Sequence, residues 1–188
     1  MKKYAMMMMM TLLITGSLMV SGCGKSESAD QNSSSNDHAA TTGEMHHSDS
    51  GELPEGIKEM TDPTYPVGSQ VTMSADHMSG MKGAQATIVG AYETTAYAVT
   101  YTPTTGGDPV KNHKWVVQEE IQDHTDQPYA AGTDVVLNAD HMSGMDGAKA
   151  TIDSAEQTTV YMVDYTPSSG GHLVKNHKWV TESELSAE

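Results

Sequence analysis

The sequence contains no arginine and no phenylalanine, and its 188 residues include a single cysteine, Cys23. Ten lysines stand against 25 aspartates and glutamates, which gives a formal net charge of −15 at pH 7. A nucleic-acid-binding protein needs a basic face, so this charge balance argues against a nucleic-acid partner. Without phenylalanine the apolar core has to come from valine, isoleucine, tyrosine, tryptophan and methionine, a set that favours β-strands.

Sequence motifs of the common enzyme classes are also missing. The chain has no phosphate-binding loop, no dinucleotide fingerprint and no G-x-S-x-G nucleophile motif. It has no H-E-x-x-H pattern for zinc and no run of aspartate and asparagine at the spacing of a calcium loop. These absences predict a binding protein rather than an enzyme.

The N-terminus has the pattern of a targeting segment. Lys2 and Lys3 precede a largely apolar run, which ends in the sequence Val-Ser-Gly before Cys23. This order is typical of a bacterial lipobox, so we expect residues 1–22 to be a signal peptide and Cys23 to receive a diacylglycerol. Two acyl chains anchor a protein stably, which predicts attachment to the extracytoplasmic face of the cell membrane. The alternative is an uncleaved anchor with an incidental cysteine.

Residues 23–51 are rich in serine, aspartate and asparagine and contain almost no large apolar side chain. Such a segment cannot bury a core, and we expect a flexible tether. It does contain four side chains that can bind metals, namely His38, Met45, His46 and His47. The tether is therefore either a generic polar linker or a loose metal-binding tail.

An internal repeat determines the expected architecture. Residues 65–122 align with residues 129–186 at a constant offset of 64, with 33 identities in 58 positions and no gap. We expect one β-module over residues 52–124 and a second over 125–188. A module of this size is marginal alone, so the two copies should pack together or one should close the other.

Within each copy the apolar pattern alternates with a period of two. Strands are predicted around residues 71–73, 86–88, 97–101 and 114–117, and at the positions 64 residues later. A single helical turn is predicted after the last of these strands. Each module is thus expected to be all-β, with four or five short strands in a small SH3-like barrel. One two-lobed β-structure is the alternative.

The string ADHMSGM occurs once in each copy, between two predicted strands, where a loop is expected. Thioether and imidazole groups together suit Cu(I), and lipidation of the only cysteine would leave methionine as the soft ligand. The first set of candidate ligands is His77, Met78 and Met81, and the second is His141, Met142 and Met145. The alternative is that one or both methionines of each loop pack inward as core residues.

A second repeated string, Asn-His-Lys-Trp, lies on the last predicted strand of each copy. It adds His113 and His177 as candidate metal ligands, and Trp115 and Trp179 as neighbours able to make a cation–π contact. Asp76 and Asp140 precede the loop histidines and are candidates to fix their imidazoles, or to cap the turn. The alternative is that each tryptophan is core and that each histidine of this string bonds to backbone.

The lipobox, the Met- and His-bearing tether and the doubled pattern from ADHMSGM to NHKW resemble the YdhK family of bacterial surface lipoproteins. That family includes the CopL-type copper-binding lipoproteins. The resemblance covers residues 52–186 and implies a tandem β-module that binds copper at the cell surface and helps the cell to resist copper toxicity. By motif match, the loop residues and the two NHKW histidines inherit the role of candidate ligands.

Two functions therefore follow from the sequence. The first is a lipid-anchored, monomeric copper-binding protein that buffers Cu(I) or passes it to a copper exporter or another copper protein. The second is an SH3-like module that holds cell wall or a protein partner, with HMSGM as a structural loop.

Overall fold

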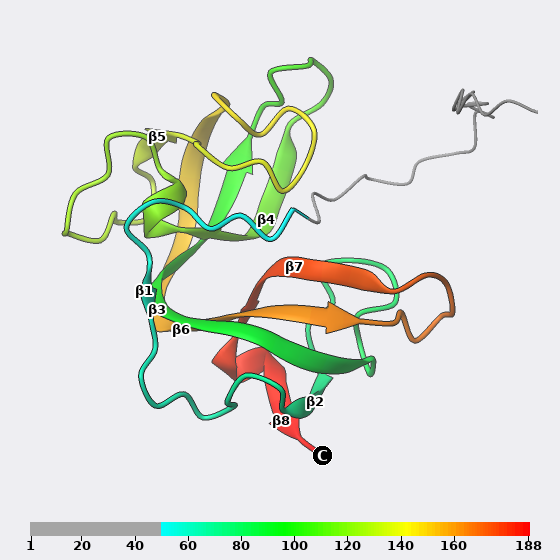
Figure 1. Cartoon of the computed structure of the whole chain (residues 1–188). Helices are drawn as coiled ribbons and strands as arrows, with labels where there is room; N and C mark the ends of the chain where they lie inside the picture. The colour runs from blue at the N-terminus through cyan, green and yellow to red at the C-terminus, as the bar shows by residue number, and fades with distance from the viewer. Residues whose placement is uncertain (1–49) are drawn as a thin grey trace, which may run out of the picture. The chain divides into compact units, whose positions relative to one another are not determined.

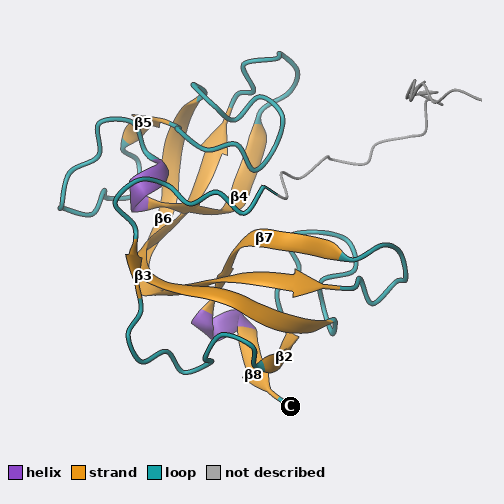
Figure 2. Cartoon of the chain, in the orientation of Figure 1, coloured by secondary structure: helices purple, strands orange, loops and turns teal. Residues whose placement is uncertain are grey.

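The computed structural model describes residues 50–188, and these residues form strands and two short 3-10 helices (Figure 2). The elements are β1 (Lys58–Glu59), β2 (Gln70–Met73), β3 (Gln85–Tyr101), β4 (Val110–Val117), η1 (Gln118–Glu120), β5 (Asp134–Val136), β6 (Lys149–Tyr165), β7 (Val174–Thr181), η2 (Glu182–Glu184) and β8 (Leu185–Ala187). The all-β prediction is confirmed, and the predicted helical turns are η1 and η2. Within the described range, none of the helices has the length and apolarity to cross a membrane. The predicted signal peptide, Cys23 and the tether ligands His38, Met45, His46 and His47 lie outside the described residues.

The two longest strands, β3 and β6, run antiparallel along almost their whole length (Figure 1). Their register extends from Ala86 opposite Tyr165 to Tyr101 opposite Ala150, with irregularities near Gly90 and Ala98. Each 17-residue strand joins two segments that the alternation pattern predicts as separate strands. The connecting residues contain no turn sequence, so the backbone continues extended from one end of the repeat to the other.

The remaining strands pair with opposite halves of β3 and β6. β2 pairs with the first half of β3 and with β8, whereas β4 pairs with the second half of β3. β5 pairs with the first half of β6, and β7 with its second half. All eight strands belong to one sheet.

Two apolar cores result, and each is built from both repeats. We call lobe A the core that combines the first half of repeat 1 with the second half of repeat 2; it contains Val71, Met73, Met81, Ile88, Tyr161, Val163, Tyr165, Val180 and Leu185. Lobe B combines the second half of repeat 1 with the first half of repeat 2; it contains Tyr97, Val99, Tyr101, Val116, Ile121, Leu137, Met145 and Ile152. The repeats therefore pack together by exchanging halves.

Because of this exchange, the two repeats of the sequence do not correspond to the two cores. A division at residue 124 separates the repeats in sequence, but neither half alone contains a complete core. The physical reason is that a segment of about 60 residues buries too little apolar surface by itself. The architecture is instead the one predicted as the alternative to two small barrels, a single two-lobed β-structure.

A third apolar cluster joins the lobes. It includes Tyr92, Trp115, Val160, Met162 and Trp179. Tyr92 and Trp179 pack edge to face with ring centroids 5.5 Å apart, a geometry that favours aromatic pairs. Both tryptophans of the NHKW strings thus lie where the lobes meet, which brings the adjacent histidines there as well.

Candidate functional site

The ADHMSGM loop makes the same compact turn in each repeat. In repeat 1 the backbone N–H of Met81 donates to the carbonyl of Met78 at 3.3 Å, and Gly83 N–H donates to the carbonyl of Met73 at 2.8 Å. Gly80 has a positive φ of 82°, which a glycine adopts without steric cost. The turn separates the two methionines of the loop and sends them to different surroundings.

The second methionine of each loop is a core residue. Met81 and Met145 are both 0% exposed and belong to the cores of lobe A and lobe B respectively. Their thioethers are enclosed by apolar side chains, so the sequence-based assignment of Met81 and Met145 as metal ligands is not supported by their positions. The inward-packing alternative applies to these two residues, whereas Met78 and Met142 are only partly buried.

Each loop is fastened to a turn of the other repeat. The backbone N–H of Ser168 donates to the carbonyl of Gly80 at 2.8 Å, and Thr104 N–H donates to the carbonyl of Gly144 at 2.9 Å. A Cβ added at Gly80 would lie 2.7 Å from the Pro167 side chain, closer than real Cβ contacts allow. Glycine is therefore required here both for its backbone conformation and for the close approach.

The first methionine of each loop and four histidines line one cavity of about 370 Å³. These residues are His77, Met78, His113, His141, Met142 and His177. Six of the eight residues predicted as metal ligands thus meet in one place, three from each repeat. The loop and the NHKW strand do come together, and the two copies of the motif face a common space.

Within the cavity, the loop of one repeat lies beside the NHKW strand of the other. The rings of His113 and His141 have centroids 6.3 Å apart in lobe B. In lobe A the hydroxyl of Tyr165 lies 4.0 Å from the sulfur of Met78, and the Tyr165 ring packs against His177 at 5.7 Å. Each half of the cavity is therefore composite, like the core beneath it.

Two glutamates, the buried Glu120 and the half-buried Glu184, hold the loop histidines, and neither was predicted from the sequence. His77 Nε2 lies 2.5 Å from Glu184 Oε1, and His141 Nε2 lies 2.6 Å from Glu120 Oε1. In both pairs the glutamate comes from the other repeat. The sequence signal was a glutamate shared at offset 64, but it was assigned only to the helical turn.

The two glutamates take the place predicted for the aspartates next to the histidines. Asp76 and Asp140 are exposed, and Asp140 instead lies 3.7 Å from the ammonium group of Lys178. Asp76 does line the cavity, but its carboxylate is not the hydrogen-bond partner of the His77 imidazole. The carboxylate that fixes each imidazole had to come from elsewhere in the chain.

The tryptophans of the NHKW strings fix these glutamates in turn. Trp115 Nε1–H donates to Glu184 Oε2 at 2.9 Å, and Trp179 Nε1–H donates to Glu120 Oε2 at 3.0 Å. Glu184 Oε2 also accepts the backbone N–H of Thr181 at 3.0 Å, and Glu120 Oε2 accepts that of Val117 at 3.1 Å, in a capping arrangement. With this many donors each carboxylate has a single orientation.

The electrostatics of Glu184 agree with an ionised acceptor. Burial by itself would raise the pKa of Glu184, but the hydrogen bond and charge of His77, with the N–H groups of Thr181 and Trp115, lower the pKa to about 2. Glu184 is thus a carboxylate at neutral pH and can only accept from His77 Nε2–H. In a neutral imidazole the other nitrogen, Nδ1, then carries the lone pair.

The Nδ1 atoms of His77 and His141 are buried and have no hydrogen-bond partner in the described part of the protein. The side chains of these histidines are only 6% and 2% exposed. A buried imidazole nitrogen is ordinarily satisfied by protein or water. These two atoms therefore have no competing hydrogen bond from residues 50–188.

Three lysines, Lys111, Lys114 and Lys178, contribute positive charge to the cavity wall. Lys114 places its ammonium group 4.9 Å from the centre of the Trp115 ring, so this lysine makes the cation–π contact that the sequence analysis assigned to a metal. Lys178 is buried and donates to the carbonyl of Glu52 at 2.7 Å. Among residues 50–188, no three His, Cys, Asp or Glu side chains lie close enough together to hold a metal ion.

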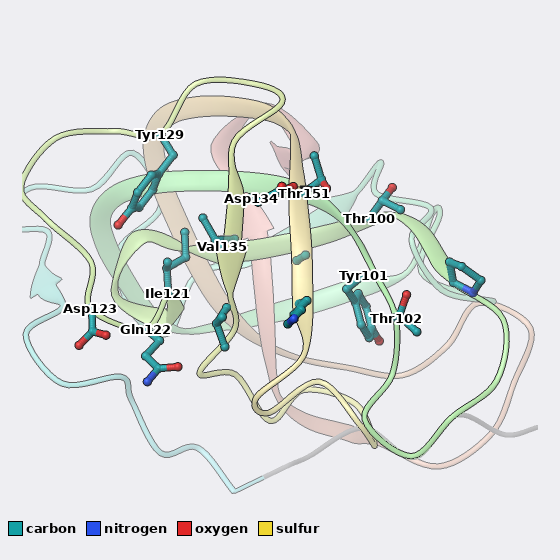
Figure 3. A pocket seen from close by; sticks show the side chains of 14 residues that line it. Thr100, Tyr101, Thr102, Ile121, Gln122, Asp123, Tyr129, Asp134, Val135 and Thr151 are labelled. Carbon is teal, nitrogen blue, oxygen red and sulfur yellow. Dashed lines mark hydrogen bonds between the residues drawn. The ribbon is translucent and has the colours of Figure 1, made fainter.

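A larger hollow of about 790 Å³ lies beside β5 in lobe B (Figure 3). Its wall carries Thr100, Asp134 and Thr151, and the Thr151 hydroxyl donates to the Asp134 carboxylate at 2.9 Å. Neither histidine nor methionine lines it. The repeated motifs thus identify the smaller cavity, and not this hollow, as the candidate site.

The fold and the site define a two-lobed all-β protein with a His- and Met-lined cavity shared by two exchanged repeats. The family model of DUF1541, a protein family of unknown function, matches residues 67–118 and 131–182, one match for each repeat. The chain belongs to this family.

Similar proteins from Bacillus subtilis support the same assignment. The chain is 54% identical over 187 residues to the uncharacterized protein YdhK of Bacillus subtilis strain 168, covering 99% of this chain and 90% of the relative. A crystal structure of the DUF1541 family protein YdhK from that organism matches with a TM-score of 0.71 and 61% identity, over 73% of this chain and 93% of that one. A solution structure of the YdhK C-terminal domain matches with a TM-score of 0.62 and 63% identity, over 65% of this chain and 93% of that one. The YdhK part of the predicted resemblance is confirmed.

Proposed function

We propose that this protein binds copper, as Cu(I), in the cavity shared by its two repeats, and that it buffers or delivers the ion outside the cell membrane. The observation that carries the proposal is the meeting of Met78, Met142 and four histidines in one cavity. The role is that of a binding protein, not of an enzyme.

The donor atoms in the cavity fit this ion. Thioether sulfur is a soft ligand that selects Cu(I), and imidazole also suits copper. Met78 and Met142 supply the sulfurs, and the buried Nδ1 atoms of His77 and His141 supply lone pairs without a competing partner. His113 and His177 are further candidate ligands on the facing strands.

Other metals fit less well. Zinc and calcium sites are built from histidine, cysteine or oxygen ligands, and within residues 50–188 no three His, Cys, Asp or Glu side chains are arranged closely enough to hold a metal ion by themselves. Metal ions that prefer hard ligands would leave the thioethers unused. The presence of methionine in both halves of the cavity is what favours Cu(I).

The proposed location comes from the N-terminal sequence. Diacylglycerol on Cys23 would hold the protein at the extracytoplasmic face of the membrane. The tether that follows carries His38, Met45, His46 and His47, which would collect copper near the membrane. A copper exporter or another copper protein is the proposed partner.

Copper titration of matched variants tests the proposal. The Met78→Leu/Met142→Leu variant should bind Cu(I) more weakly than the parent in competition with a chromophoric chelator. Leucine keeps the apolar volume of methionine and removes only the sulfur, so the fold should persist. Equal affinity of the double variant and the parent would contradict the cavity as the copper site.

A second candidate function has one observation in its favour. Met81 and Gly80 serve the structure of the loop, through burial and close packing against Pro167. Each lobe would then act as an SH3-like barrel that holds cell wall or a protein partner, and HMSGM would shape the loop. Capture of the protein by purified cell wall, at a level unchanged by copper, would favour this second candidate.

A further inference from the structure

The pairing of each loop histidine with a glutamate recurs at both ends of the cavity. His77 of repeat 1 bonds to Glu184 of repeat 2, and His141 of repeat 2 bonds to Glu120 of repeat 1. The two pairs share the same atoms, Nε2 and Oε1. A chance surface contact would not recur with the same geometry at two positions.

Each glutamate has donors on both oxygens, and these donors come from both repeats. Glu184 accepts from His77 and from Trp115 of repeat 1, and it also accepts from the backbone of Thr181 in its own repeat. Burying a carboxylate costs free energy unless it is paired and hydrogen-bonded. Retaining two such groups in the protein interior suggests a task that apolar packing would not perform.

The task concerns the tautomer and the orientation of the imidazole ring. In the neutral imidazole, a carboxylate that accepts from Nε2–H fixes one tautomer and one ring orientation, so that Nδ1 carries the lone pair. The Nδ1 atoms of His77 and His141 are buried and make no hydrogen bond within the described residues. Both histidines also line the cavity that contains Met78 and Met142.

We infer that Glu184 and Glu120 are positioning residues, which present Nδ1 of His77 and His141 to a soft metal ion in the cavity. This inference rests on the proposed copper-binding function. It adds that each half of the site is completed by a glutamate of the opposite repeat, so neither repeat can assemble a working half-site by itself.

Amide substitution tests the inference, because glutamine keeps the shape of glutamate and removes its charge. The Glu184→Gln and Glu120→Gln variants should each weaken Cu(I) binding about 10- to 100-fold, the range seen when partners of metal-bound histidines are changed. The matched control is Asp140→Asn, which makes the same chemical change on an exposed carboxylate next to His141. This control should bind Cu(I) like the parent.

The imidazole tautomer provides a measurement that does not depend on copper. Nitrogen-15 NMR of the metal-free parent should show His77 and His141 protonated at Nε2 and not at Nδ1. In Glu184→Gln the His77 signals should move toward a mixture of tautomers, whereas those of His141 should stay unchanged. A mixture of tautomers in the parent would overturn the inference.

A second variant addresses the case in which a glutamine variant does not fold. Trp115→Phe removes the indole N–H that donates to Glu184 but leaves Glu184 and His77 in place. It should weaken Cu(I) binding and loosen the His77 tautomer in a chain whose melting curve remains cooperative. If the parent binds Cu(I) and all three variants bind it equally well, the positioning role is wrong. If the parent itself binds no Cu(I), the proposed function fails instead.

Discussion

Glu184 accepts a hydrogen bond from His77 across 107 positions of sequence, with 2.5 Å between Oε1 and Nε2. The contact exists because β3 and β6 pair along their length and place the end of repeat 2 against the loop of repeat 1. One interaction thus connects the exchange of halves to the chemistry of the cavity. The equivalent pair, Glu120 and His141, does the same in lobe B.

The exchange of halves predicts that one repeat cannot fold as a monomer. A chain of residues 52–124 contains half of each core. We expect it to be unfolded at low micromolar concentration, or to form a dimer in which two copies exchange halves. Sedimentation and amide NMR spectra distinguish these states, and a folded monomer of the single repeat would contradict the architecture.

Met81 and Met145 are predicted to matter for stability and not for copper. Met81→Ala should lower the free energy of unfolding by about 2–5 kcal/mol, the usual cost of such a core cavity, because Met81 is fully buried in lobe A. Met78→Ala should cost less because Met78 is only partly buried. Urea unfolding gives both values, and a larger loss for Met78→Ala would be inconsistent with the two positions.

Gly80 and Gly83 form a matched pair in the same loop. Both have positive φ, but an added Cβ meets Pro167 and Ser169 at Gly80 and nothing within 4 Å at Gly83. Gly83→Ala should therefore cost about 1–2 kcal/mol, the backbone term alone. Gly80→Ala should cost more than this in urea unfolding and should disturb the loop against the opposite repeat. Equal losses of unfolding free energy in the two variants would show that the contact between the added Cβ and Pro167 is relieved without cost.

Alkaline unfolding follows from the buried tyrosines. Burial, as the largest cause, raises the pKa of Tyr161 to about 12, with the nearby Glu182 acting in the same direction, and burial also raises the pKa of Tyr97, Tyr101 and Tyr165. The folded state holds these protons more tightly than the unfolded state, so this stabilisation is complete below pH 10 and is lost as the pH rises toward 12. Phenolate absorbance and circular dichroism, recorded together against pH, should change in one transition within this window. Ionisation of Tyr97, Tyr101, Tyr161 or Tyr165 near pH 10 in a chain that remains folded, followed residue by residue by NMR, would contradict the burial of these hydroxyls.

The sequence was sufficient to predict the strands and the loop but not their partners. Alternation of apolar residues located β2, β4 and β7, and the turn residues located the ADHMSGM loop correctly. The exchange of halves was not visible because the alternation pattern has the same form whether a strand pairs within its repeat or across repeats. The choice depends on long-range packing between β3 and β6, which no local signal records.

The candidate site shows the same division between local and long-range information. His77, Met78 and their repeat partners were predicted from donor chemistry alone, and they do meet in one cavity. The burial of Met81 in the core of lobe A could not be predicted, because sequence spacing does not reveal which way a residue points after a glycine turn. Glu184 was missed because its partner His77 lies in the other repeat, and the nearer carboxylate of Asp76 appeared to be the simpler choice.

The most direct test of the account is a Cu(I) competition titration of three proteins: the mature chain, the chain that begins at residue 50, and that shorter chain carrying Met78→Leu and Met142→Leu. The account predicts that residues 50–188 bind Cu(I) at a small whole number per molecule without the tether. It also predicts that the double variant binds it at least about tenfold more weakly, a difference of about 1.4 kcal/mol. Copper binding by the mature chain that disappears on removal of residues 23–49, or that is unchanged by loss of the two sulfurs, would contradict it.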